Sequence, residues 1–90
     1  MRRPRCARPG CNAIGHHRHH VILEQHAHFL RPGFSIHDPR NLIHLCFDCH
    51  INGHHGNRRL AVDDLPPETL LYVREALGAY GADYLRRYYR

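Results

Sequence analysis

Four cysteines in two close pairs constrain this chain more than any other feature. They are spaced as C-x4-C and C-x2-C, with a long gap between the pairs: Cys6, Cys11, Cys46 and Cys49. A chain of 90 residues buries a thin core and often needs a metal ion or disulfides for stability. Thiolates are good ligands for tetrahedral zinc, and two such pairs can converge on one ion. We therefore predict a structural zinc site formed by all four cysteines.

The alternative is a pair of disulfides in a secreted protein. Pairing within each motif would close only very short loops, which restrict the unfolded chain least. The basic residues 1–5 (MRRPR) lead into no apolar segment of a secretory signal. No apolar run approaches the roughly 20 residues of a membrane span. We expect a cytoplasmic protein with no membrane contact, and a reducing compartment favours zinc over disulfides.

The charge balance favours a polyanionic partner. All thirteen basic residues are arginine, against eight acidic residues, and the formal net charge is +5. Arginine presents a planar group of donors that matches phosphate. This composition is typical of nucleic-acid-binding proteins, although basic small domains are common and charge alone leaves the partner open.

The first two thirds of the chain predict two short strands and a helix. The apolar runs at residues 21–23 and 42–45 predict the strands, and a long connection with Pro-Gly and Asp-Pro turns lies between them. A short helix is expected from Phe47 to about Gly53. The polar stretch over residues 53–59 is expected to form a surface loop. These elements indicate an α+β fold.

The last third of the chain predicts helices. Residues 63–68 (DDLPPE) combine an acidic cap, proline in the first turn and glutamate, which is a strong helix start. Gly78 or Gly81 is expected to end this helix, and residues 82–89 to form a further turn or two. We interpret residues 1–62 as the core and residues 63–90 as a helical extension packed on it, within one domain.

Five polar residues carry the chemistry that the sequence suggests. His19 and His20 stand beside the first predicted strand, and Asn41 precedes the second. His50 and His54 have the i, i+4 spacing that places two imidazoles on one face of a helix. A third ligand from the strand would complete a site with three protein ligands and open positions, which is typical of a catalytic metal.

Other histidines compete for two of these positions. The pair His16-His17 lies just before the selected pair, which we prefer because it directly adjoins an apolar run. His55 competes with His54, and the i, i+4 spacing favours His54. The remaining histidines are interpreted as ordinary surface or half-buried residues.

The segment from Cys6 to His54 resembles the HNH endonucleases. The matching segments are CARPGC, HHVI and NLIHLCFDCHINGH, which cover a little over half of the chain. The resemblance implies a small ββα-metal, treble-clef-like fold of the subtype with a four-cysteine zinc site, followed here by C-terminal helices. It also implies a metal-dependent endonuclease that hydrolyses DNA phosphodiester bonds, by nicking or double-strand cleavage with weak sequence specificity.

The resemblance assigns a role to each residue of the constellation. His20 would be the general base that deprotonates the attacking water. His19, His50 and His54 would bind the catalytic ion, and Asn41 would tie the loop that orients His20. Many relatives have aspartate in place of His19. Three imidazoles suit Ni²⁺, Mn²⁺, Co²⁺ or Zn²⁺ better than Mg²⁺, which prefers oxygen ligands.

The remaining expectations concern partners. Arg18, Arg58 and Arg59 are the candidates for binding the scissile phosphate, and the sequence does not distinguish among them. Small HNH proteins of this kind resemble those encoded beside phage packaging genes, which implies a terminase or another phage or host DNA-processing protein as partner. The sequence leaves the oligomeric state open. The alternative function is a non-catalytic, zinc-dependent nucleic-acid-binding module, which explains the cysteines and arginines but not the histidine constellation.

Overall fold

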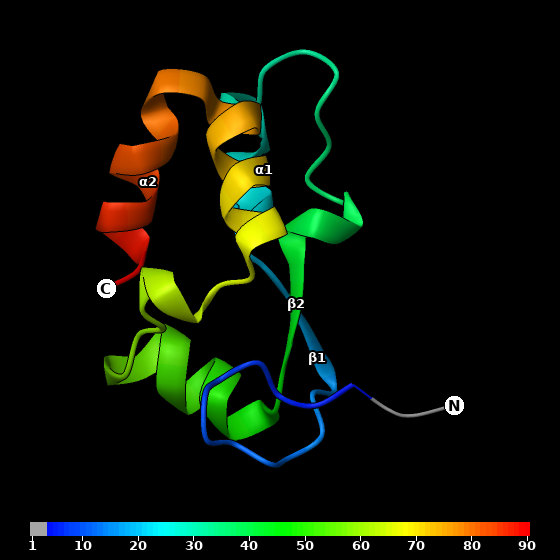
Figure 1. Ribbon diagram of the computed structural model, residues 1–90, viewed down its shortest axis with the longest axis vertical. Coiled ribbons are helices and arrows are strands. Elements are labelled where there is room, and N and C mark those ends of the chain that lie inside the picture. Colours follow the sequence, from blue (N-terminus) through cyan, green and yellow to red (C-terminus); the bar gives the residue numbers. More distant parts are fainter. Residues whose placement is uncertain (1–3) are drawn as a thin grey trace.

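Two antiparallel strands and two C-terminal helices frame the α+β structure (Figure 1). The computed structural model describes residues 4–90, and the basic residues 1–3 lie outside the described part of the chain. Strand β1 (His17–His20) pairs with β2 (Leu42–Leu45), so that His17 is opposite Leu45 and His20 is opposite Leu42. Short 3-10 helices occupy Glu24–Phe29, Pro39–Asn41, Val62–Asp64 and Gly78–Tyr80.

The first strand lies upstream of its predicted position. The sequence predicted it over residues 21–23, whereas β1 ends at His20. Val21 and Ile22 are fully buried, and their apolar character therefore reflects core packing rather than strand pairing. The Asn41 side chain, in place of a strand neighbour, binds both backbone groups of Ile22. The prediction of a strand over Leu42–Leu45 is confirmed.

A helix of π type follows β2 and spans Asp48–Asn57. The sequence predicted that this helix would end near Gly53 and that residues 53–59 would form a loop. The helical segment instead runs on to Asn57, with non-helical backbone angles at Gly56 (φ −99°, ψ −127°), and the backbone N–H of Arg58 donates to the Gly53 carbonyl oxygen at 3.0 Å. This bond joins residues five apart, as in a π-helix, which is wider than an α-helix. Histidines five apart therefore face the same side here.

The C-terminal helices form where the sequence predicted them. Helix α1 (Pro67–Leu77) begins with a proline, and Gly78 follows the helix with φ +60°. That left-handed conformation ends the helix at low steric cost because glycine has no Cβ. Helix α2 (Gly81–Tyr88) follows after one 3-10 turn. A Cβ on Gly81 would lie 2.9 Å from the Arg74 Cα, so glycine permits the close approach of the two helices.

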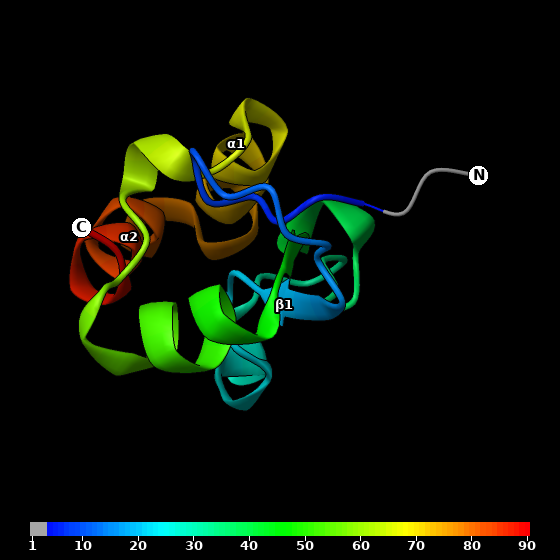
Figure 2. The same cartoon turned by 90° about the horizontal axis from the view of Figure 1, so that it is seen from below.

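Tyrosines of the two helices attach them to the connection between the strands. The Tyr72 hydroxyl donates to the Ser35 carbonyl and accepts from the Ser35 N–H. The Tyr84 hydroxyl accepts from the Leu23 N–H at 3.0 Å. Figure 2 shows the molecule from below, where the N-terminal loop leads into β1. Across residues 4–90, no helix combines the length and apolar character needed to cross a membrane.

Candidate metal centres

The four cysteines come together from three segments. Cys6 and Cys11 lie on the N-terminal loop, which turns tightly at Gly10 with φ +80°. Cys46 directly follows β2, and Cys49 is in the first turn of the π-helix. The Ala7 N–H donates to the His44 carbonyl at 2.7 Å and holds the loop against β2. The cluster therefore connects the N-terminal loop, the sheet and the π-helix.

The geometry of the cysteine cluster fits a tetrahedral metal ion. All four Sγ atoms lie within 4.8 Å of one another, and those of Cys11 and Cys46 are 3.9 Å apart. Zinc–sulfur bonds of about 2.3 Å at tetrahedral angles place the sulfurs about 3.8 Å apart. The four thiols are free rather than paired in disulfides. The cluster is thus spaced to hold a structural ion such as zinc.

Burial disfavours the thiolate form of Cys49. It raises the pKa of the Cys49 thiol to about 12, with hydrogen bonds from the neighbouring cysteines adding to the effect. Without a cation, a Cys49 thiolate would be costly in this environment. A bound ion supplies the positive charge that deprotonated ligands need, which couples ion binding to folding.

A second cluster consists of three imidazoles. His19 comes from β1, and His50 and His55 come from the π-helix. The Nδ1 of His19 lies 3.2 Å from the Nε2 of His50, and the Nε2 of His55 lies 3.2 Å from the same atom. Metal–nitrogen bonds of about 2.0–2.1 Å at tetrahedral angles separate the nitrogens by about 3.4 Å. The three nitrogens are therefore spaced as ligands of one ion.

The outer nitrogens of two of these imidazoles are engaged elsewhere. The Nδ1 of His50 lies 2.9 Å from the Nδ1 of His17, and the Nε2 of His19 lies 2.9 Å from the Tyr89 hydroxyl. A neutral imidazole has one N–H and one lone pair. When the outer nitrogen carries the proton, the lone pair of each ring is directed toward the cluster, as a metal ligand requires.

His54, which the sequence predicted as a metal ligand, has its Nδ1 engaged outside the imidazole cluster. Its Nδ1 accepts a hydrogen bond from the Leu60 N–H at 3.1 Å, and its ring stacks on Tyr89 with centroids 4.6 Å apart. In the neutral ring the proton is then on Nε2, which leaves no lone pair there for an ion. The π-helical spacing brings His55 into the nitrogen cluster instead. The assignment of His54 as a ligand stays a prediction, and the geometry favours His55.

Burial favours the uncharged form of His19, His50 and His54. It lowers the pKa of His19 to about 2, and the neighbouring histidines add to the effect. Burial likewise lowers the pKa of His54 to about 4 and depresses the pKa of His50. A metal ligand must present a neutral imidazole, so protons compete little for the His19 and His50 nitrogens.

An open hollow of about 440 Å³ lies beside the imidazole cluster. Its lining comes from β1, the following segment and the π-helix: Arg18, His19, His20, Leu23, Glu24, Gln25, His50 and His55. His20, the predicted base, has its Nδ1 3.5 Å from a Glu24 carboxylate oxygen. Arg18 shares this hollow and, being two residues from His20 on the strand, has its side chain on the same face of the sheet.

Asn41 is fully buried and supports the segment that follows His20. Its Oδ1 accepts from the Ile22 N–H at 2.7 Å, and its Nδ2 donates to the carbonyls of Ile22 and Ile36 at 3.1 and 2.8 Å. These three bonds satisfy buried backbone groups that no strand partner reaches. Asn41 thus holds the segment that follows β1, and its role in orienting His20 stays a prediction.

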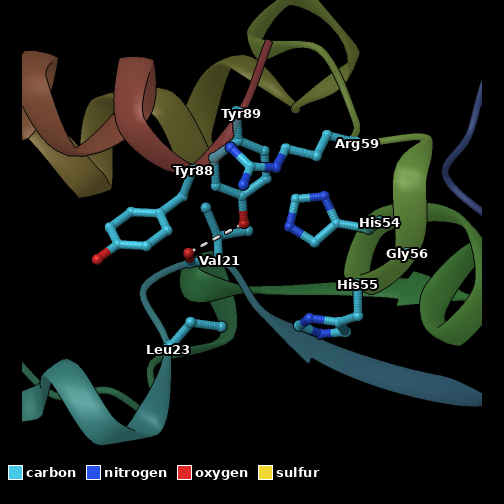
Figure 3. A pocket seen from close by; sticks show the side chains of 8 residues that line it. All are labelled: Val21, Leu23, His54, His55, Gly56, Arg59, Tyr88 and Tyr89. Carbon is cyan, nitrogen blue, oxygen red and sulfur yellow. Dashed lines mark hydrogen bonds between the residues drawn. The ribbon is translucent and has the colours of Figure 1, made fainter.

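The other two arginine candidates lie outside the hollow. Arg58 pairs with Asp48 at 3.0 Å. Arg59 donates from Nη1 to the Arg87 carbonyl and lines a neighbouring pocket of about 150 Å³ (Figure 3). Tyr89 also lines that pocket, and its contact with His19 had no signal in the sequence because the two residues are 70 positions apart.

No family model matches the chain, and comparison with curated proteins and solved structures gives no significant match. The side chains of the chain form a cysteine cluster whose Sγ atoms are at zinc-binding distance. A second cluster, of imidazole nitrogens, lies next to an open hollow.

Proposed function

We propose that this protein is a metal-dependent endonuclease of the HNH type that hydrolyses phosphodiester bonds in DNA. The observation that carries the proposal is the hollow that contains both the imidazole cluster and a further histidine, His20. We assign His19, His50 and His55 as the residues that would hold the ion, because their nitrogens lie close together. The proposal assigns zinc to the cysteine cluster.

Three side chains of the hollow have separate roles in the proposed reaction. A bound divalent ion would stabilise negative charge on the phosphate and the leaving oxygen. His20 accepts a proton from the attacking water, because imidazole can exchange protons near neutral pH. Glu24, 3.5 Å from Nδ1 of His20, orients the ring so that Nε2 is directed at the water. Arg18 binds the phosphate.

The proposed reaction is an in-line hydrolysis. The water oxygen forms a bond to phosphorus as the bond to the 3′-oxygen breaks, and solvent protonates the leaving oxygen. The products have 5′-phosphate and 3′-hydroxyl ends. The neutral imidazole ligands favour Ni²⁺, Mn²⁺, Co²⁺ or Zn²⁺ over Mg²⁺.

The cysteine cluster and the imidazole cluster contain residues that are neighbours in the sequence. Cys49 directly precedes His50 on the π-helix. A zinc ion at the cysteines would therefore fix the start of the helix that bears two of the three imidazole ligands. This coupling explains how so small a chain can hold its ligands in a defined position.

Plasmid nicking tests the proposed function. Zinc-loaded protein is incubated with supercoiled DNA and Mn²⁺, Ni²⁺, Co²⁺ or Mg²⁺, alongside the variants His20→Ala and His28→Ala. We expect wild type and His28→Ala to nick, and His20→Ala to lose at least about 100-fold, the usual contribution of a general base. His28 is the control because it is an exposed histidine outside the hollow.

Two outcomes would contradict the proposal. Cleavage that survives His20→Ala would remove the base from the mechanism. Folded protein that binds DNA without cutting it in any of the ions would favour the non-catalytic nucleic-acid-binding module.

A further inference from the structure

Tyr89, which follows α2, lies between the C-terminal helix and the imidazole cluster. The residue is 3% exposed. Figure 3 shows its ring beside His54 and its hydroxyl directed at Val21. The hydroxyl oxygen is 3.0 Å from the Val21 carbonyl and 2.9 Å from the Nε2 of His19. A residue far along the chain thus contacts a proposed metal ligand directly.

The donors and acceptors of this contact have one consistent arrangement. A carbonyl oxygen only accepts, so the Tyr89 O–H donates to Val21. The phenol oxygen must then accept the Nε2–H of His19. Because a neutral imidazole carries a single N–H, the lone pair of His19 is on Nδ1, the atom that lies 3.2 Å from the Nε2 of His50.

The backbone around Tyr89 is held at several points. Its N–H donates to the Leu85 carbonyl at 2.9 Å, which extends the last turn of α2. The Arg90 N–H donates to the Leu60 carbonyl at 2.9 Å, and the Arg90 carbonyl accepts from the Val62 N–H. Leu60 in turn donates its N–H to His54. The hydroxyl is therefore fixed in position by the fold.

We propose that Tyr89 is a positioning residue of the metal centre, which selects the tautomer of His19 and orients its Nδ1 toward the ion. The proposal rests on the imidazole metal site of the proposed function. It makes the C-terminal segment part of that site rather than only a cover over the core. Partners of the second nitrogen of a ligating histidine typically change metal affinity by 10–100-fold.

Metal titration of Tyr89→Phe tests this role, because the variant keeps the ring and removes only the hydroxyl. Tyr84→Phe is the matched control: Tyr84 is fully buried, and its hydroxyl accepts from the Leu23 N–H and lies 2.7 Å from the Nδ1 of His26, which is outside the imidazole cluster. Ni²⁺ is titrated calorimetrically into each zinc-loaded protein. We expect Tyr89→Phe to raise the Kd of the second site by about 10–100-fold, and Tyr84→Phe to leave it within about twofold.

A second measurement needs no variant. Long-range ¹H–¹⁵N spectra of the wild-type protein, with zinc at the cysteines only, should show His19 protonated on Nε2. Proton placement on Nδ1, or an unchanged Kd in folded Tyr89→Phe, would overturn the role of Tyr89 while leaving the nuclease proposal intact. A wild-type protein without any second metal site would overturn both.

Discussion

The histidine cluster shows how neighbours prepare an imidazole to bind an ion. His17 contacts the outer nitrogen of His50, and Tyr89 contacts the outer nitrogen of His19. The Tyr89 contact leaves the lone pair of His19 directed into the cluster, and the His17 contact does the same for His50 when the Nδ1 of His50 carries the proton. The same reasoning separates His54 from His55, since the Leu60 N–H occupies the His54 lone pair. Hydrogen-bond partners, more than the number of histidines, distinguish the candidate ligands from the other imidazoles.

The choice between His54 and His55 leads to the first prediction. His55→Ala should weaken Ni²⁺ binding at the second site by at least about 100-fold, because losing a ligand costs more than losing an outer partner. His54→Phe keeps the stacking on Tyr89 and should change the Kd by less than about tenfold. Calorimetric titration of the zinc-loaded variants measures both.

The opposite order of effects would show that the ion uses His54 at the i, i+4 spacing. In that case the Leu60 N–H would have to release Nδ1, or the π-helix would have to tighten when the ion binds. His28 is exposed, and His28→Ala serves as the control for the effect of removing a histidine outside the cluster on Ni²⁺ binding.

At the scale of elements, the sequence predicted the helices better than the first strand. Proline and acidic residues at 63–68 mark the start of α1 by local chemistry, and the structure follows them. Val21 and Ile22 are instead buried in the core, after the end of the strand pairing between β1 and β2. Strand β1 is mostly histidine, so its residues serve the site and show no alternating apolar pattern.

The candidate site was predictable only in part. The cysteine spacing predicted their cluster, and His19 and His50 do lie together. The participation of His55 depends on a π-helical winding that polar residues around Gly53 do not reveal. The role of Tyr89 depends on tertiary packing between distant segments, for which a single sequence carries no local signal.

The cysteine cluster leads to a prediction at this scale, because it joins three elements. Cys46→Ser should abolish cooperative unfolding at zinc saturation, since metal affinity contributes directly to folding in small zinc proteins. Phe47→Ser is the control: this neighbour is 59% exposed and should leave the transition in place. Circular dichroism during urea denaturation, with elemental analysis for zinc, reports both. A folded Cys46→Ser protein with unchanged zinc content would contradict the structural site.

For the whole molecule, buried neutral histidines predict how stability depends on pH. The folded-state pKa values of His19 and His54, about 2 and about 4, lie below the usual 6.5. Below that usual value the unfolded chain binds protons that the folded chain does not. Stability is therefore full above about pH 6.5 and falls as the pH decreases toward 4, by up to about 1.4 kcal/mol per pH unit for each histidine.

Urea denaturation between pH 7.5 and 5.5, with zinc at the cysteines only, measures this slope. His54→Phe should reduce this slope, whereas exposed His28→Gln should leave it unchanged. A free energy of unfolding that is constant over this range would show that these imidazoles are not held neutral by burial.

The central claim is that the ion at the imidazole cluster is the one that cuts DNA. The most direct test measures plasmid nicking by zinc-loaded protein while Mn²⁺ or Ni²⁺ occupancy of the second site is increased in steps. The account predicts that the nicking rate rises in proportion to occupancy and levels off at one ion per chain beyond the zinc. Nicking that is independent of second-site occupancy, or a fully occupied site that does not cut, would contradict it.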